Sequence, residues 1–258
     1  MTRAAITRLK ATGKHYCLLI EGSRIDHGLH SSDAASAAKD AIAYSRAFKE
    51  ALKEVSEGQN DVQILSVADH STGGLTLGMQ PDWQLTFDGA RTRWKNPPRT
   101  YRPEVLVNVS MSTGNLSSRL CCDPSLTTDT SRREFITSML GLEPDETNLA
   151  QLANLRSRMV DVCSAAEAEE DWPSGECGMG TQLVLNGMVQ HAAGLGMTTS
   201  SHTGEDVHVY AAGTHAKTFR GAMENSEIGK LHLGLLNLSL DPITQALNDC
   251  KVPVHPIE

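Results

Sequence analysis

The chain has 258 residues, a mass of 27.8 kDa, a formal net charge of -8 at pH 7 and a sequence pI near 5.7. A chain of this length can bury a substantial core in one large domain or two modest ones. Its acidic charge argues against nucleic-acid binding, because attraction to a phosphate backbone normally requires a basic surface. A run of about eighteen apolar residues is absent, so neither a membrane span nor a secretory leader is expected in this sequence.

The first elements expected along the chain are a helix, a strand and a second helix. Residues 1–10 have the pattern of an amphipathic helix, and the apolar run Tyr16–Ile20 predicts a buried strand. Ser32 or Asp33 can cap the next helix, which should end near Gly58. The apolar side chains of this helix recur at steps of three and four residues: Ala41, Tyr44, Phe48, Leu52 and Val55.

Residues 62–67 form a second apolar run, which predicts another strand. Strand, helix and strand in this order predict the βαβ unit of a mostly parallel sheet that is covered by helices. Open α/β sheets place their ligand sites beyond the C-terminal ends of the strands. The sequence therefore predicts an α/β fold, with the functional residues just after its strands.

The pattern changes at Met79, where several prolines and then a Ser- and Thr-rich segment follow. We interpret this part of the chain as an insertion. Helical spacing returns over residues 133–140 and 145–168. Residues 206–212 predict a further strand, and the helix after it should carry four apolar side chains on one face: Ile228, Leu231, Leu235 and Leu238.

Three segments place acidic and imidazole side chains beside predicted strands. Glu21-Gly-Ser-Arg-Ile-Asp26-His-Gly-Leu-His30 follows the first strand, and Ala68-Asp69-His70-Ser-Thr-Gly-Gly follows the second. Ser201-His202-Thr-Gly-Glu-Asp-Val precedes the third. Asp26 and His30 are four positions apart, so a helix would place them on one face and within reach of one ion. Together the three segments predict a metal site.

These strings, in this order and strand context, resemble the C-terminal half of alkaline phosphatases, especially eukaryotic members with Asp-His-x-Thr-Gly-Gly after the second strand. The resemblance covers about residues 1–79 and 190–238. It implies an incomplete three-layer αβα sandwich with a mostly parallel sheet. In this organisation, residues 1–79 form the metal-site part of the core, residues 80–189 form a crown-like or lid-like insertion, and residues 190–258 return to the core with a C-terminal helix and tail.

The resemblance also implies phosphate monoester hydrolysis by two zinc ions and one magnesium ion, through a phosphoserine intermediate. Asp26, His30 and His202 would hold the first zinc ion. Asp69 and His70 would contribute to the second zinc ion, and Glu21 to the magnesium ion. The family's serine nucleophile lies in an Asp-Ser-Ala type motif that this sequence lacks. The chain is therefore expected to be a C-terminal portion without the catalytic serine, and to be inactive alone.

Two alternatives remain open at this point. The chain can be a non-catalytic metal-binding domain that keeps the site of Asp26, His30 and His202. It can also be a related hydrolase, such as a phosphodiesterase or sulfatase, although the motifs fit those classes less well. The resemblance further allows a homodimer of the full-length parent, in which no contact residue can be named.

The six cysteines and three glycosylation sequons bear on the cellular compartment. Cys17 lies in the first predicted strand and is expected to be a buried free thiol. Four other cysteines fall in the middle of the chain, where an oxidising compartment would allow disulfides: Cys121, Cys122, Cys163 and Cys177. Acceptor sequons begin at Asn108, Asn115 and Asn237. Together these features favour an exported parent protein.

Overall fold

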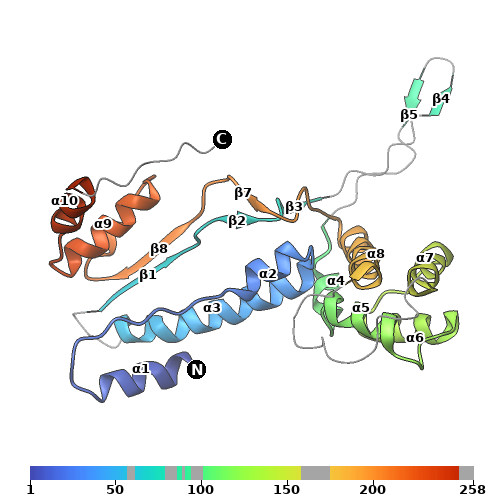
Figure 1. Cartoon of the computed structure of the whole chain (residues 1–258), viewed down its shortest axis with the longest axis horizontal. Helices are drawn as coiled ribbons and strands as arrows, with labels where there is room; N and C mark the ends of the chain where they lie inside the picture. The colour runs from blue at the N-terminus through green and yellow to red at the C-terminus, as the bar shows by residue number, and fades with distance from the viewer. Residues whose placement is uncertain (57–61, 79–85, 89–90, 94–100, 158–174, 250–258) are drawn as a thin grey trace. The chain divides into compact units, whose positions relative to one another are not determined.

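The computed structural model describes residues 1–56, 62–78, 86–88, 91–93, 101–157 and 175–249 (Figure 1). The chain divides into two compact units. The first comprises Met1–Lys49 and Ala68–Val207, and the second comprises Glu50–Val67 and His208–Glu258. The division expected from the sequence, with an insertion over residues 80–189, stays a prediction.

The helices expected in the N-terminal part of the chain are present. Helix α1 spans Thr2–Lys10, helix α2 spans Arg24–His30, and helix α3 spans Ala34–Ser56. Asp33 caps α3, because its carboxylate accepts from the backbone N–H of Ser36 at 2.9 Å. Asp33 also accepts from the backbone N–H of Thr113 at 2.8 Å. One buried carboxylate thus begins α3 and ties it to the helical segment further along the chain.

Over residues 101–157 and 175–193, that helical segment contains five helices and most of the buried core. Its helices are α4 (Pro103–Asn108), α5 (Thr113–Cys122), α6 (Asp129–Leu140), α7 (Glu146–Ser157) and α8 (Gly175–Ala193). The core cluster joins residues from α3 to α8, and its most deeply buried side chains include Ala35, Leu116, Ile136, Leu140 and Leu185. The sequence pattern predicted most of α6 and all of α7, and it missed α4, α5 and α8. The last part of the second predicted helix, residues 158–168, lies outside the described residues.

Helix α5 was missed because its Ser- and Gly-containing sequence has a low intrinsic preference for helix. Tertiary contacts compensate for this. Ser112 caps the helix by accepting from the backbone N–H of Asn115 at 3.3 Å. The buried hydroxyl of Ser117 donates to the carbonyl of Gly178 in α8 at 2.5 Å. A small hydroxyl side chain lets the two helices approach closely, where sequence spacing alone indicates a loop.

The described strands form four two-stranded antiparallel sheets. Strand β1 (Gln63–Val67) pairs with β8 (Val209–Gly213), and the two-residue strand β2 (Ser71–Thr72) pairs with β7 (His202–Thr203). Short ladders also join β3 (Thr76–Leu77) to β6 (Leu195–Gly196) and β4 (Thr86–Asp88) to β5 (Arg91–Arg93). The parallel pairing expected for the strand at residues 62–67 is therefore not observed within the described part of the chain.

The expected buried strand over Tyr16–Ile20 is also not formed. The backbone there has no assigned strand, and Leu19 is 90% exposed. The prediction of a buried thiol was wrong for the same reason, because Cys17 is free but exposed. An apolar run becomes a buried strand only where a neighbouring strand and a covering helix remove it from water. The described residues provide no such ladder partner for this segment.

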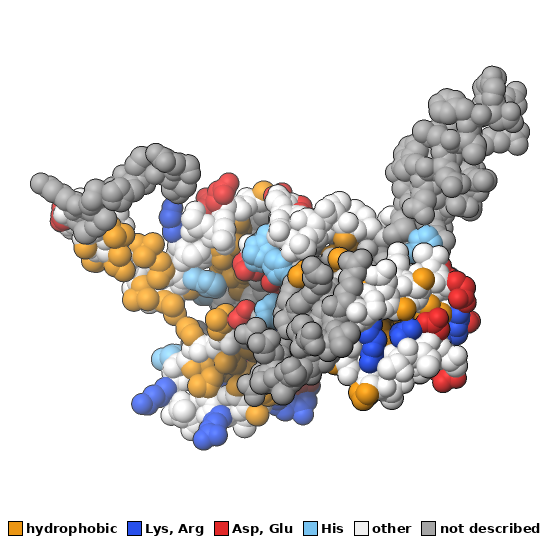
Figure 2. All heavy atoms as spheres, turned by 45° about the vertical axis from the view of Figure 1, so that its right-hand side comes forward, with side chains coloured by type: hydrophobic (Ala, Val, Ile, Leu, Met, Phe, Trp, Pro, Cys, Tyr) orange, Lys and Arg blue, Asp and Glu red, His pale blue; other side chains and the backbone are white. Residues whose placement is uncertain are grey.

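The second unit ends in two helices with apolar surfaces. Helix α9 spans Asn225–Leu235, as expected, and helix α10 spans Asp241–Asp249, where no helix was expected. Hydrophobic side chains gather over these helices in the space-filling view (Figure 2). Five leucine or isoleucine side chains of this region are exposed: Leu236, Leu238, Leu240, Ile243 and Leu247.

Cys121 and Cys122 are both disulfide-bonded, as the sequence allowed. Among the helices of the described residues, none combines the length and apolar character needed to span a bilayer.

Candidate metal centre

Helix α2 carries Asp26 and His30 one turn apart, at the corner where the chain turns into α3. The corner is tight, because the backbone N–H of Asp33 donates to the carbonyl of Gly28 at 2.8 Å. Gly28 is buried against α3, and a Cβ atom at this position would lie 2.9 Å from the backbone nitrogen of Ala37. Glycine therefore allows α2 to pack close to the first turn of α3.

Helix α8 secures the same corner through polar contacts. Asn186 donates to the carbonyl of Ser31 at 2.6 Å, and Gln190 donates to the carbonyl of Ser32 at 3.0 Å. Ser32 itself has a left-handed backbone, with φ of 55°. The side-chain amides of α8 thus satisfy carbonyl groups at the end of α2, which fixes the position of the helix that carries Asp26.

The short β2–β7 ladder brings the second and third sequence segments together. Its register places Thr72 opposite His202, and His70 lies two residues before Thr72. The next residues require glycine, because Gly73 and Gly74 both have positive φ, at 82° and 54°. A Cβ atom on Gly73 would lie 2.4 Å from the methyl group of Met197. The two glycines therefore let this turn pack directly against the segment that leads to His202.

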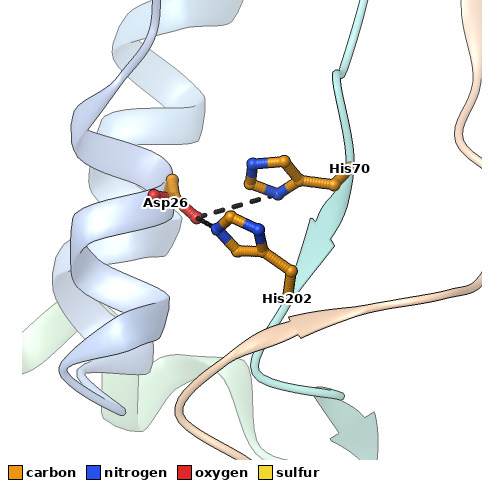
Figure 3. Close-up of side chains that lie close together, drawn as sticks. All are labelled: Asp26, His70 and His202. Carbon is orange, nitrogen blue, oxygen red and sulfur yellow. Dashed lines mark ion pairs between the residues drawn. The ribbon is translucent and has the colours of Figure 1, made fainter. Parts of the chain in front are cut away.

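As a result, the carboxylate of Asp26 is surrounded by three imidazoles. Its Oδ2 atom lies 3.3 Å from Nε2 of His30, and its Oδ1 atom lies 3.9 Å from Nε2 of His202 and 4.0 Å from Nδ1 of His70. The rings of His70 and His202 stack with centroids 3.4 Å apart. Figure 3 shows both rings directed at the Asp26 carboxylate from the neighbouring strands.

One ligand atom each from Asp26, His70 and His202 can be chosen so that all lie within 4.8 Å of one another. His30 adds a fourth donor, because its Nε2 atom lies 3.0 Å from Nε2 of His202. A carboxylate with neutral imidazoles is the donor set that zinc takes in proteins. The side chain of His202 is 52% exposed and that of Asp26 is 33% exposed, so the cluster remains accessible from solvent. The residues present therefore fit a zinc ion.

A backbone contact orients one of the imidazoles. Nδ1 of His30 lies 2.6 Å from the carbonyl oxygen of Ser200. A carbonyl only accepts hydrogen bonds, so Nδ1 carries the proton and the neutral ring keeps its lone pair on Nε2. That lone pair faces Asp26 and His202. This is the usual arrangement of a metal-binding histidine, whose other ring nitrogen donates to a fixed acceptor.

The remaining two predicted ligands lie at or beyond the edge of the cluster. Oδ2 of Asp69 lies 3.1 Å from Nε2 of His70, and the Asp69 side chain is 85% exposed. Glu21 is exposed near the start of α2 and does not belong to the group of Asp26, His70 and His202. The structure thus brings four predicted ligands together, places Asp69 beside them and leaves Glu21 outside the closest group.

Sequence reasoning missed two residues that contact the cluster. Thr72 donates its hydroxyl proton to Oδ1 of Asp26 at 2.5 Å, and Ser200 supplies the carbonyl that faces His30. Thr72 lies within the Asp69-His70-Ser-Thr-Gly-Gly motif, so its place next to two predicted ligands was a usable signal. The Ser200 contact uses only the backbone, and no side-chain pattern could have revealed it.

These observations define an α/β protein with a candidate divalent-metal centre, and comparison with known proteins identifies its family. A family model described as alkaline phosphatase matches residues 1–238. Alkaline phosphatase of Schizosaccharomyces pombe is 30% identical over 245 residues, which cover 95% of this chain and 40% of the relative. Repressible alkaline phosphatase of Saccharomyces cerevisiae is 27% identical over 252 residues, covering 92% of this chain and 39% of the relative. The chain therefore belongs to the alkaline phosphatase family.

Solved structures agree on the fold. The cold-active alkaline phosphatase from the psychrophile Shewanella sp. superposes with a TM-score of 0.69 at 24% identity, over 91% of this chain and 49% of that structure. The Thermus thermophilus alkaline phosphatase gives a TM-score of 0.58 at 20% identity, over 84% of this chain and 42% of that structure. The chain has an alkaline-phosphatase-like α/β fold, and it spans about two fifths of the length of the curated relatives.

Proposed function

We propose that the chain is the metal-binding portion of a phosphomonoesterase, which uses two zinc ions and one magnesium ion and forms a phosphoserine intermediate. Family membership supports the reaction class. The observation that carries the proposal is the convergence of Asp26, His30 and His202 from segments far apart in the sequence, with His30 and His202 172 positions apart.

In this proposal Asp26, His30 and His202 hold the first zinc ion. Asp69 and His70 contribute to the second zinc ion, and Glu21 contributes to the magnesium ion. Bound zinc would supply Lewis-acid stabilisation of the negative charge that develops on phosphate-ester oxygens. The chain's own contribution is to orient donors: Ser200 fixes the ring of His30, and the β2–β7 ladder holds His202 beside the Asp26 carboxylate.

The serine nucleophile is proposed to lie on polypeptide outside these 258 residues. The sequence contains no Asp-Ser-Ala motif, and the chain spans about two fifths of its curated relatives. The same absence favours the second candidate function, which is zinc binding without catalysis. Catalysis requires that a longer product of the same reading frame contains an Asp-Ser-Ala motif, whereas zinc binding without catalysis does not.

The test uses the 258-residue protein and any product extended upstream in the same frame. With zinc and magnesium supplied, the 258-residue protein should release negligible phosphate from an aryl phosphate. An extended product with Asp-Ser-Ala should hydrolyse the ester and lose this activity on His202→Ala. The matched control is His208→Ala, which removes an exposed imidazole outside the cluster and should keep the activity. Turnover by the 258-residue protein that disappears with His202→Ala would show that the nucleophile is present after all.

A further inference from the structure

The buried hydroxyl of Thr72 contacts two side chains of the cluster at once. Thr72 is 6% exposed, and its Oγ1 atom donates to Oδ1 of Asp26 at 2.5 Å and lies 3.2 Å from Nδ1 of His70. We propose that Thr72 is a positioning residue that links the first zinc site, through Asp26, to the second, through His70. This inference rests on the proposed function, because it takes both side chains as zinc ligands.

Because the hydroxyl of Thr72 has a single proton, it can donate only one of its two hydrogen bonds, to Asp26 or to His70. An ionised carboxylate only accepts hydrogen bonds, so the proton of Thr72 is directed to Asp26. The hydroxyl oxygen then has only lone pairs to offer His70, so it accepts from Nδ1 when that nitrogen carries the proton of the neutral ring. Oδ2 of Asp69 is also an acceptor, and it lies 3.1 Å from Nε2, so in the metal-free protein it competes for that proton. A zinc ion bound by Nε2 and Asp69 would end this competition and leave the proton on Nδ1, next to Thr72.

The place of Thr72 in the fold suits this role. It lies opposite His202 in the β2–β7 ladder, and a Cβ atom on the following Gly73 would lie 3.4 Å from the carbonyl oxygen of Leu29 in α2. The hydroxyl is therefore held between helix α2, which carries Asp26 and His30, and strand β7, which carries His202. Loss of this hydroxyl would leave one oxygen of Asp26 without its donor and free the ring of His70 to turn.

Thr76 provides a contrast within the same segment. Its hydroxyl donates to the carbonyl of Gly196 at 3.2 Å in the β3–β6 ladder, and it contacts no ionisable side chain in the hydrogen bonds described. Thr72 and Thr76 thus have the same chemistry and lie four positions apart, but only Thr72 contacts predicted ligands. A Thr76→Val variant is therefore a matched control for Thr72→Val.

The first measurement is metal affinity, by calorimetric titration of the metal-free protein with zinc. Removal of a hydrogen-bond partner from a metal ligand typically weakens binding by about 10- to 100-fold. We expect such a loss for Thr72→Val, recovery for Thr72→Ser and little change for Thr76→Val. The absorption spectrum of the cobalt-loaded protein should also change in Thr72→Val and return in Thr72→Ser, because it reports ligand geometry rather than overall stability.

The second measurement needs no metal. Long-range ¹H–¹⁵N NMR at about pH 8.5, well above the usual histidine pKa, identifies which ring nitrogen carries the proton. The comparison is made in an Asp69→Ala background, in which no carboxylate competes for the proton at Nε2. There, proteins with Thr72 intact or with Thr72→Ser should show His70 protonated on Nδ1, and Thr72→Val should show a mixture. If Thr72→Val keeps the wild-type tautomer and zinc affinity, the inference about Thr72 is overturned and the zinc site stands. If the wild-type protein binds no zinc, the inference and the proposed zinc site both fail.

Discussion

Nε2 of His30 and Nε2 of His202 lie 3.0 Å apart and face each other. His30 holds its proton on Nδ1, which faces the carbonyl of Ser200, so its Nε2 atom accepts. In the neutral metal-free cluster, His202 must therefore be the donor of this pair. A cation that replaces that shared proton would meet two nitrogen lone pairs next to the carboxylate of Asp26.

Replacement of the central carboxylate should abolish the zinc site. We expect Asp26→Ala to weaken zinc binding by at least about 100-fold, because the variant loses the carboxylate that, among the described residues, lies within 4.0 Å of all three imidazoles. Titration of the metal-free protein measures the effect. His27→Ala is the matched control, since His27 lies on the same helix and contacts Arg24 at 3.3 Å instead. Equal affinity in Asp26→Ala and His27→Ala would contradict the assignment of Asp26 as a ligand.

Replacement of glycine by alanine should have opposite effects on stability at Gly28, in the tight corner between α2 and α3, and at Gly187, in helix α8. Gly28→Ala should destabilise the protein by about 1–3 kcal/mol, because the new methyl group meets the backbone of Ala37. Gly187→Ala, in helix α8, should stabilise it by about 0.5–1 kcal/mol, because its Cβ atom meets nothing within 4 Å and alanine favours helix.

Urea unfolding of both variants measures these changes in the free energy of unfolding. Gly28→Ala should in addition weaken zinc binding, since the shift of α2 moves Asp26 and His30 away from β7. A stabilised Gly28→Ala protein with unchanged zinc affinity would mean that the corner relaxes without cost.

Asp33 is expected to matter more for stability than any other cap of the described helices. Asp33→Ala removes the cap of α3 and leaves the buried N–H of Thr113 without its acceptor, which should cost about 2–4 kcal/mol. Ser36→Ala removes only the hydroxyl that donates to Asp33 at 2.8 Å, and should cost about 1 kcal/mol. Thermal and urea unfolding of the two variants should rank them in this order, and the reverse order would refute the anchoring role of Asp33.

Acid titration should reveal the contacts of Asp123, at the end of α5. Hydrogen bonds from the hydroxyl and backbone N–H of Ser125, followed by one from Arg119, lower the pKa of Asp123 from 3.8 to about 2. A lowered folded-state pKa means that the ionised carboxylate contributes stability above about pH 4, and that this contribution is lost as the pH falls toward 2.

Carboxyl ¹³C NMR measures this pKa directly. The midpoint for Asp123 should rise toward its ordinary value in Ser125→Ala, because the largest single contribution comes from the Ser125 hydroxyl. The stability difference between wild type and Asp123→Asn should shrink as the pH is lowered from about 5 to about 3. A difference that stays constant over this range would mean that the folded and unfolded proteins share one Asp123 pKa.

The sequence predicted the composition of the centre better than the sheet around it. Acidic and imidazole side chains beside predicted strands indicated Asp26, His30, His70 and His202, and these side chains lie together. The strand at Tyr16–Ile20 was wrong because burial of an apolar run depends on neighbours, which sequence spacing does not reveal. Helix α5 was missed because its stability comes from contacts such as Ser117 to Gly178 rather than from helix preference.

The 172 positions between His30 and His202 have a consequence for folding. In the unfolded chain, bringing these two rings together closes a very long loop. In the native state, the β2–β7 ladder and the side-chain amides of α8 are among the contacts that hold this loop closed. An ion bound to both rings would act as a clamp across that loop. The metal would then be part of what keeps the distant halves of the polypeptide assembled, and a chelator would loosen the architecture as well as empty the site.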